Sequence, residues 1–411
     1  MIPGRSLQQG HALSLKSWQA IYAETPGKRN VIHLNNAGAA LPPSVVLETQ
    51  KDYLDLEASM GGYEAAMTKE KELNQVYVSV AQLINCASEE VAIVENASVG
   101  WQMAFYSIPF ARGDRILTVE AEYASNYLSY LQLARQKGVV VNIIPSNEEG
   151  DVCLSSLADM IDSSVKLISV THVPTNCGTI NDVESIGDIA RKHNILYLVD
   201  ACQSVGQMPV DVELIKCDFL SATSRKYLRG PRGIGFLYVR KSCMEKYQLH
   251  PPMIDLFGAT LNVLSSSGYT LRPDARRFEN WESNYAAKLG FGAAVDYALA
   301  LGLNRIKERI DELASTLRDR LAAVDGVALH AISTAQCGIV SFSLKHIEAK
   351  EVMKILREGK KINVSVSSPS STLIDATKHG LPDLIRASIH YYNDEGEIDV
   401  FVAAIAQLLS R

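Results

Sequence analysis

Short apolar runs alternate with helical patterns of apolar and polar residues between about positions 80 and 240. A short apolar run bounded by polar residues is typical of a buried strand, and strands that alternate with helices favour a mainly parallel sheet. The sequence therefore predicts an α/β fold in this region. The predicted strands cover 116–119, 139–144, 167–170, 195–199, 219–222 and 234–239, and two predicted helices cover 126–136 and 183–193.

A different pattern begins in the last third of the chain. It predicts a long helical tract from Tyr285 to about Val324 and a final amphipathic helix, for which Asn393 or Asp394 with Glu397 forms the start signal. Few strands with covering helices are typical of a second, smaller α+β domain. The other predicted elements are strands at 338–343, 362–366 and 384–389 and a helix at 351–358, with the last helix ending near 411.

Composition narrows the classes of ligand. Hydrophobic residues make up 47% of the chain, which is enough for a packed interior. The chain has 40 basic and 46 acidic residues, a net charge of −6, and the two signs are interleaved. Because no basic patch forms, we expect neither nucleic acid nor an anionic membrane surface as a partner, but a small molecule.

The seven cysteines stand singly with no C-x-x-C spacing, which argues against a disulfide framework and against a zinc site. The first thirty residues hold no continuous apolar core, and nowhere do eighteen uncharged apolar residues run together. Neither a signal peptide nor a membrane span is predicted on that basis. We therefore expect a soluble protein of the reducing cytoplasm, without a metal site.

Lys226 is the most informative single residue, because a predicted strand ends at Asp200 upstream of it and Gln203 follows closely. A desolvated lysine amine can form a Schiff base with an aldehyde cofactor, and pyridoxal 5'-phosphate (PLP) is the obvious candidate. Asp200 is placed to pair with the ring nitrogen, and Gln203 to hydrogen-bond the ring hydroxyl. On local evidence alone, Asp200 also fits a helix cap and Lys226 a solvated surface lysine.

Further segments offer groups for the phosphate and the ring of that cofactor. The amides of a predicted helix start at Ser98 and Val99, with the Ser98 hydroxyl, are suited to a phosphate. Thr223 and Arg225 can complete the phosphate shell, and Tyr123 follows a strand end where its ring can stack on the cofactor. The ordinary alternatives are a plain helix cap for Ser98 and a half-buried packing residue for Tyr123.

Arg386 lies in the predicted strand 384–389 between apolar neighbours. A half-buried guanidinium pairs well with a planar carboxylate, and an amino-acid substrate supplies one. An internal salt bridge to an aspartate or glutamate is the alternative. Thr175 lies in a turn-rich stretch, so its role in a site depends on its neighbours.

Taken together, these segments resemble the class V aminotransferase family of fold-type I PLP enzymes, which includes cysteine desulfurases, C–S lyases and isopenicillin N epimerase-like proteins. The resemblance extends over nearly the whole chain and is most specific around Asp200 and Lys226, where Thr223-Ser-Arg-Lys226 precedes a glycine-rich stretch. It implies a fold-type I PLP-dependent transferase. The implied parts are an N-terminal segment, 1–40, that packs with the small domain, a large domain, 41–290, and a small C-terminal domain, 291–411.

The resemblance also implies roles for single residues. Lys226 would hold the cofactor as a Schiff base and move the proton at the substrate α-carbon, with Asp200 on the ring nitrogen and Tyr123 stacked on the ring. Because family members build each active site with residues of a neighbouring subunit, it implies a homodimer. The other implied contacts are Ser98, Val99, Thr175, Gln203, Thr223 and Arg225 for the cofactor, and Asn36 and Arg386 for the substrate.

Four positions depart from the desulfurases of this family. Tyr123 stands where they stack a histidine, Arg225 where they usually have a histidine before the lysine, and Glu282 where the partner subunit commonly donates a threonine to the phosphate. The loop 364–372 carries serines where desulfurases place a nucleophilic cysteine. Since a serine hydroxyl cannot accept sulfane sulfur, persulfide-forming desulfuration is not expected.

The sequence leaves open which reaction follows removal of the α-proton from an amino-acid substrate. The family label favours transamination, with β-elimination of a C–S bond next and epimerisation as a further alternative. A non-catalytic sensor that binds PLP or a nucleotide is an alternative of another class. The presence of both Lys226 and Arg386 argues against such a sensor, because a binder has little use for both residues.

Overall fold

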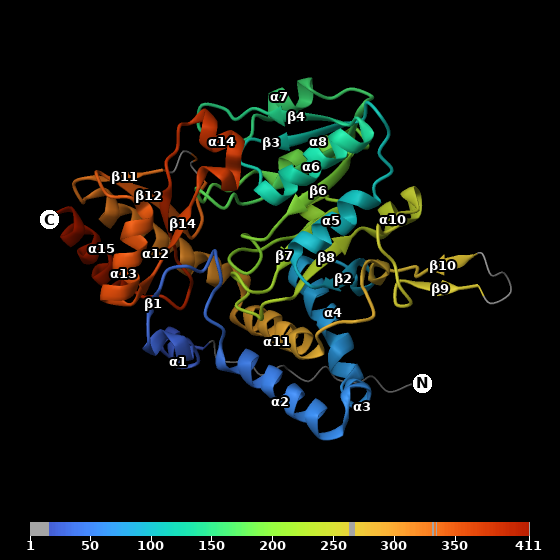
Figure 1. Ribbon diagram of the computed structural model, residues 1–411, viewed down its shortest axis with the longest axis horizontal. Helices are drawn as coiled ribbons and strands as arrows, with labels where there is room; N and C mark the ends of the chain where they lie inside the picture. The colour runs from blue at the N-terminus through green and yellow to red at the C-terminus, as the bar shows by residue number, and fades with distance from the viewer. Residues whose placement is uncertain (1–15, 263–267, 331–332, 334, 411) are drawn as a thin grey trace, which may run out of the picture.

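The computed structural model describes residues 16–410 except 263–267, 331–332 and 334. These residues form two main sheets with helices packed on them (Figure 1). The expected α/β fold, with a large, mainly parallel sheet and a smaller C-terminal part, is confirmed. The first fifteen residues of the predicted N-terminal segment and the predicted helix end at residue 411 lie outside the described residues, and the predicted domain boundaries stay predictions.

The larger sheet has seven strands in the order β2-β8-β7-β6-β5-β3-β4. All neighbouring strands are parallel except where β8 pairs with β2 and β7. All six strands predicted for this region are present, with small differences at their ends. They are β3 (Arg115–Val119), β4 (Val140–Ile144), β5 (Val165–Thr171), β6 (Leu196–Asp200), β7 (Phe219–Thr223) and β8 (Gly235–Val239), and β2 (Val91–Val94) completes the sheet.

Helices cover both faces of this sheet. Along β6, Leu196 and Leu198 pack in one apolar cluster with α5, α6 and α10, whereas Tyr197 and Val199 pack in another with α4, α8 and α11. Burial on both faces explains why the strands read as continuous apolar runs. The two predicted helices are present as α6 (Ala124–Lys137) and α8 (Val183–Lys192), and the others are α4 (Glu70–Ile84), α5 (Ala97–Ser107), α10 (Lys241–Tyr247) and α11 (Tyr285–Leu301).

The smaller sheet is antiparallel and has the order β11-β12-β15-β14. Its apolar face packs against α12, α13 and α15, which lie at the left in Figure 1. Asp394 caps α15 and forms a capping box with Glu397, as predicted. The elements are β11 (Val327–Leu329), β12 (Ile339–Leu344), β14 (Ser365–Ser367), β15 (Leu384–Ser388), α12 (Leu303–Ala322), α13 (Ala349–Lys360) and α15 (Glu395–Leu409).

Two predicted elements are each divided in the structure. The strand predicted at 362–366 is two strands, because β13 (Ile362–Asn363) pairs with β1 (Ile32–His33) and β14 pairs with β15. The helical tract predicted from 285 to 324 is interrupted at Gly302, which has a φ of +85° and separates α11 from α12. The two helices meet at 80°, and no single helix of the described residues is long and apolar enough to cross a membrane.

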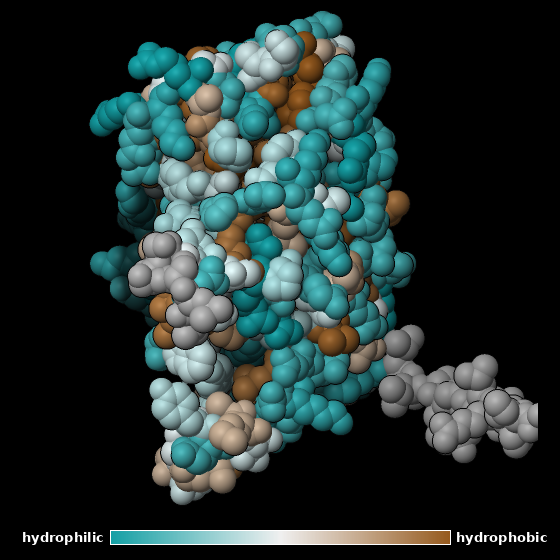
Figure 2. Space-filling view, turned by 90° about the vertical axis from the view of Figure 1, so that its right-hand side faces the viewer, coloured by the Kyte–Doolittle hydropathy of each residue, from teal (hydrophilic) through white to brown (hydrophobic). Residues whose placement is uncertain are grey.

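The remaining elements lie in segments for which the sequence predicted none. The β9–β10 hairpin projects at the right in Figure 1, and Figure 2 faces this side, where hydrophobic residues form small patches between hydrophilic ones. The elements are α1 (Trp18–Ala23), α2 (Ser44–Met60), α3 (Gly62–Thr68), α7 (Leu154–Asp159), α9 (Val212–Ile215), α14 (Leu373–Lys378), β9 (Ala259–Leu261), β10 (Tyr269–Leu271), and the 3₁₀ turns η1 (Pro26–Arg29), η2 (Ser88–Glu90), η3 (Ala275–Phe278) and η4 (Pro369–Thr372).

Candidate active site

A cavity of about 170 Å³ lies at the edge of the large sheet where β2, β3, β5, β6 and β7 end. These strands run in the same direction, so their carboxyl ends meet at one edge, which is where sheets of this kind bind ligands. Most of the predicted site residues are brought together here. The predicted residues that line the cavity are Ser98, Tyr123, Thr175, Asp200, Gln203, Thr223, Arg225 and Lys226.

Lys226 lies in the connection between β7 and β8, which returns the chain along the neighbouring strand. The backbone around it is closely packed, since a Cβ at Gly206 would stand 2.4 Å from the carbonyl carbon of Tyr227. Burial lowers the pKa of the Lys226 amine, whereas the nearby Asp200 carboxylate raises it. Lys226 is therefore no solvated surface lysine, and the lowered pKa favours the unprotonated amine that attacks an aldehyde.

Asp200 is the last residue of β6 and is buried. Its Oδ1 accepts the backbone N–H of Cys202 at 2.9 Å, and its Oδ2 accepts the side-chain amide of Asn126 at 3.0 Å. No helix begins after β6 until α9, so Asp200 is no helix cap. No lysine, arginine or histidine of the described residues lies within 4.0 Å of the carboxylate. Its charge is therefore open to a cationic ligand in the cavity.

Arg386 is buried on β15 of the smaller sheet and points to the loop that follows β5. Its Nη1 donates to the backbone oxygen of Thr175 at 2.8 Å and to the Thr175 hydroxyl, and its Nε donates to Ser365 Oγ at 3.0 Å. Among the described residues no carboxylate lies within 4.0 Å of the guanidinium, so the alternative of an internal salt bridge is not found. A cation held only by neutral oxygens is suited to an incoming carboxylate.

Gln203 lines the cavity and hydrogen-bonds Thr175, which also lines it. Its Nε2 donates to Thr175 Oγ1 at 3.3 Å and to the backbone oxygen of Ala37 at 3.2 Å. Its Oε1 is buried and has no hydrogen-bond partner. Because buried polar atoms are usually paired in native proteins, this oxygen is suited to accept a hydrogen bond from a ligand in the cavity.

The groups predicted for ring and phosphate surround the rest of the cavity. Tyr123 is the residue before α6, lines the cavity and is 37% exposed, so part of it is accessible to a ligand. Ser98 lies in the first turn of α5, and Thr223 ends β7. Arg225 donates to the backbone oxygen of Gly38, which fixes its guanidinium at the cavity wall.

Arg386 reaches the cavity only through Thr175, and two further predicted site residues, Val99 and Asn36, do not line it. The Val99 amide already donates to Asn96 Oδ1 at 3.0 Å, and the Val99 side chain packs in the apolar cluster on α5. The Asn36 amide donates to the backbone oxygen of Ser388 at 2.7 Å and accepts the Tyr392 hydroxyl. Asn36 therefore joins the N-terminal segment to β15, and the ligand contacts of both residues stay predictions.

Sequence reasoning missed several residues that the fold brings to the cavity. Asn126 and Cys202 line it beside Asp200, and Glu122 lies buried directly behind Asn126. Each comes shortly after the end of a predicted strand, which is the signal that could have found it. The other lining residues not predicted are Asn96, Ala97, Thr171 and Val173.

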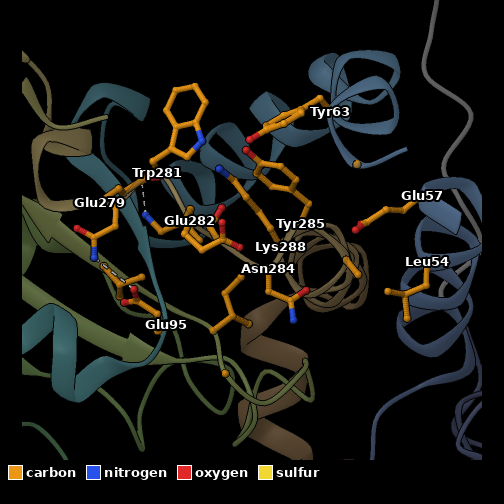
Figure 3. Close-up of a pocket in the computed structure, with 18 residues that line it drawn as sticks. Leu54, Glu57, Tyr63, Glu95, Glu279, Trp281, Glu282, Asn284, Tyr285 and Lys288 are labelled. Atoms are coloured by element: carbon orange, nitrogen blue, oxygen red, sulfur yellow. Dashed lines mark hydrogen bonds between the residues drawn. The ribbon is translucent and has the colours of Figure 1, made fainter. Parts of the chain in front are cut away.

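A second and larger cavity of about 580 Å³ lies between α2, α3 and the start of α11. Figure 3 shows the rings of Tyr63, Trp281 and Tyr285 at the top of this cavity, with Glu282 below them. Lys288, at its base, donates to the Tyr77 hydroxyl at 2.6 Å. Within one chain Glu282 thus lies in a cavity separate from the one that holds Lys226.

The donor set of the smaller cavity fits PLP. Lys226 offers an amine for the aldehyde, Asp200 a carboxylate for the ring nitrogen, and Gln203 a buried oxygen that lacks a partner. A hydroxyl at Ser98 and a guanidinium at Arg225 are suited to the phosphate. In the described residues no group of three His, Cys, Asp or Glu side chains is placed to hold a metal ion, and all seven cysteines are free.

Comparison with known proteins agrees with this geometry. The family model "Aminotransferase class-V" matches residues 31–401. A probable cysteine desulfurase of Methanothermobacter thermautotrophicus is 31% identical, covering 94% of this chain and 96% of the relative. The apo structure of the cysteine desulfurase from Thermococcus onnurineus NA1 is similar with a TM-score of 0.89 at 28% identity, covering 97% of this chain and 99% of that chain.

A structure of the cystine C-S lyase C-DES with its reaction product cysteine persulfide is 24% identical, with a TM-score of 0.83, covering 93% of this chain and 99% of that chain. At this identity the likeness shows the fold alone. The match of the family model, in contrast, extends from before β1 into α15 and includes every residue that lines the cavity. The chain therefore belongs to the class-V aminotransferase family and is a PLP-dependent enzyme of fold type I.

Proposed function

We propose that this enzyme is a C–S lyase that removes a sulfur substituent from the β-carbon of a cysteine-like amino acid. The observation that carries the proposal is the placement of Lys226 and Asp200 in one cavity, with the unpaired cation of Arg386 beside it. Relatives that are cysteine desulfurases support C–S bond chemistry. Transamination, which the family label favoured, therefore becomes the second candidate.

Each residue has a role that follows from its surroundings. Bound PLP supplies an aldehyde carbon for Lys226 and a ring that accepts the electron pair left when a bond to the substrate α-carbon breaks. Asp200 accepts the hydrogen bond of the ring nitrogen and keeps it protonated. Arg386 binds the substrate carboxylate, and Tyr123 covers one face of the ring. Lys226 would act as the base that takes the α-proton of the substrate.

Elimination needs no nucleophile on the protein for the sulfur. The Cα–H bond breaks first, and the electron pair then expels the sulfur from Cβ, so that the substrate sulfur leaves directly. The loop 364–372, which forms β14 and η4, carries serines and no cysteine. We therefore propose that no persulfide forms on this loop, because a hydroxyl does not accept sulfane sulfur.

Product analysis separates the candidate reactions. With cystine or cysteine as substrate, β-elimination yields pyruvate and ammonia together with a sulfur product. Desulfuration through a protein persulfide leaves alanine, transamination leaves a keto acid that retains sulfur, and epimerisation leaves the opposite enantiomer. Pyruvate as the main carbon product supports the proposal. Alanine or a sulfur-containing keto acid would overturn it.

The Lys226→Ala variant tests the attachment of the cofactor. The purified wild-type enzyme should show an absorbance band of covalently held PLP that shifts when a substrate amino acid is added. Replacement of Lys226 should abolish this band and lower activity by at least about a thousandfold, because both the attachment and the proton acceptor are lost. Lys350→Ala, which removes an exposed lysine of α13, should leave both unchanged. A persisting band in Lys226→Ala would refute the assignment.

We also propose that the enzyme works as a homodimer, as its family resemblance implies. Exposed apolar side chains support this, since Leu54, Tyr63, Met67 and Trp281 are each more than half exposed and lie on α2 and α3 or beside the larger cavity.

A further inference from the structure

Glu122 is a buried carboxylate directly behind the candidate active site, on the connection from β3 to α6. No lysine, arginine or histidine of the described residues lies within 4.0 Å of it. Instead, four hydrogen-bond donors point to its two oxygens, which matches the roughly four lone-pair sites of a carboxylate. The donors are the Tyr123 backbone N–H at 2.8 Å, the Asn126 amide at 2.9 Å, and the hydroxyls of Thr118 at 2.9 Å and Thr171 at 2.5 Å, whereas the Tyr130 hydroxyl, 3.3 Å away, donates to Ser169 Oγ at 2.8 Å.

Asn126 connects this carboxylate to Asp200. The Nδ2 of Asn126 donates one hydrogen bond to Glu122 Oε1 at 2.9 Å and another to Asp200 Oδ2 at 3.0 Å. An amide nitrogen has two hydrogens, so both are used. The reverse orientation of the amide would place its oxygen against two carboxylate oxygens, which repel it. The nitrogen of Asn126 must therefore face both carboxylates.

The geometry restricts how Asp200 can turn. Its Oδ1 is held by the Cys202 backbone N–H at 2.9 Å and its Oδ2 by Asn126. The Asn126 side chain is itself held at Glu122, whose position is set by hydroxyls from β3 and β5. Two fixed donors, one on each oxygen, leave the remaining lone pairs of Asp200 for the cavity.

We propose that Glu122 is a positioning residue that acts through the Asn126 amide to hold the Asp200 carboxylate in the orientation that meets the ring nitrogen of the cofactor. This inference rests on the proposed function, because it needs Asp200 to be the partner of that nitrogen. Glu122 itself does not line the cavity that holds Lys226 and Asp200. Its effect is on the strength and the geometry of cofactor binding.

Cofactor affinity and the circular dichroism of the cofactor band test this inference, and neither depends on turnover. PLP is titrated into apoprotein of the wild type, Glu122→Ala, Asn126→Leu and the double variant. A hydrogen bond to a charged group contributes about tenfold to a hundredfold to affinity, so each single variant should bind PLP more weakly by that factor. Both should also change the circular dichroism, because the ring is held less firmly.

The double variant distinguishes a connected pair from two independent effects. If Glu122 acts only through Asn126, the double variant should bind PLP no more weakly than Asn126→Leu alone. The inference is overturned if the double variant loses PLP affinity by the product of the two single losses. It is also overturned if Glu122→Ala keeps the PLP affinity and the circular dichroism of the wild type. Glu122→Gln should restore most of the affinity, because its side-chain oxygen can still accept from Asn126.

Controls separate this inference from loss of folding and from failure of the proposed function. Ser129→Ala removes a buried hydroxyl of α6 that bonds to Ser125 of the same helix, and it should leave PLP affinity unchanged. Thermal unfolding of each apoprotein shows which variants fold, and Glu122→Gln remains informative if Glu122→Ala does not. If Lys226→Ala abolishes the cofactor band while Glu122→Ala and Asn126→Leu bind PLP as the wild type does, only the present inference fails.

Discussion

At the scale of single residues, the candidate active site holds charged side chains that neutral groups surround. Asp200 accepts hydrogen bonds only from amide N–H groups, and Arg386 donates hydrogen bonds only to hydroxyl and carbonyl oxygens. Removing an ion from water without an opposite charge costs roughly several kcal/mol. Such an arrangement is typical of a site whose ligand brings the missing charges, here a cationic ring and a carboxylate.

The pKa of Lys226 provides a test at this scale. Burial lowers it and Asp200 raises it, so Asp200→Asn should lower it further. In apoprotein, acetylation of Lys226 by a limiting reagent is measured as a function of pH. The pH of half-maximal acetylation should lie below about 10.4, the pKa of a free lysine, and it should be lower still in Asp200→Asn. Peptide mass spectrometry measures this residue by residue.

Asp162→Asn is the matched control, because it removes a surface carboxylate that pairs with Arg115 outside the cavity. It should leave the titration of Lys226 unchanged. An upward shift in Asp200→Asn would contradict the electrostatic account of the site.

Which residues of the site could be predicted depends on how they are placed along the chain. Asp200 and Lys226 follow apolar runs, so their position at the sheet edge follows from the pattern alone. Asn126 lies at the start of a helix, where a polar side chain is usually exposed, and only the tertiary structure turns it towards Asp200. Asn36 was predicted from family resemblance, but hydrogen bonds to Ser388 and Tyr392 occupy its side chain.

At the scale of elements, the predictions were best where burial on both faces gives a strand an apolar sequence. The strands of the large sheet were found for that reason, whereas α2 and α3 were not, since exposed Leu54, Tyr63 and Met67 blur their helical pattern. The tract from 285 to 324 was predicted as one helix, because apolar periodicity continues across Gly302. The break there depends on a backbone conformation that periodicity does not reveal.

Gly302→Ala tests that break. A φ of +85° is unfavourable for residues other than glycine, so the substitution should cost about 1–3 kcal/mol and lower the unfolding temperature by a few degrees. Gly359→Ala is the control, since a Cβ at this position of α13 would meet no atom within 4 Å. It should be neutral or slightly stabilising. Equal melting temperatures for Gly302→Ala and the wild type, measured by calorimetry, would show that the bend does not need glycine.

At the scale of the whole molecule, the N-terminal segment, the large sheet and the small sheet meet at Arg229. This side chain is fully buried and donates to the backbone oxygen of Leu41, the Thr25 hydroxyl and the Tyr391 hydroxyl. Its guanidinium also lies 4.4 Å from the ring centre of Tyr392. The three parts are therefore joined by one residue that lies three positions after Lys226.

The homodimer is a prediction at this scale. Light scattering with size-exclusion chromatography should give twice the mass of one chain. Tyr63→Glu with Met67→Glu should shift the protein towards the monomer, because charges replace exposed apolar contacts. Leu214→Glu, which changes a leucine on α9 that is also more than half exposed, should remain dimeric. A wild-type monomer at micromolar concentration would disprove the predicted assembly.

The contact of Arg386 with Thr175 joins a strand of the small sheet to the loop that follows a strand of the large one. The distance between the Arg386 guanidinium and the Lys226 amine is thus not set within one sheet. It is set by how the small sheet packs against the large one. A substitution in the packing between the sheets, distant from both charges, would alter the length of substrate that fits between them. Selectivity for chain length is in this sense a property of domain docking rather than of the cavity wall.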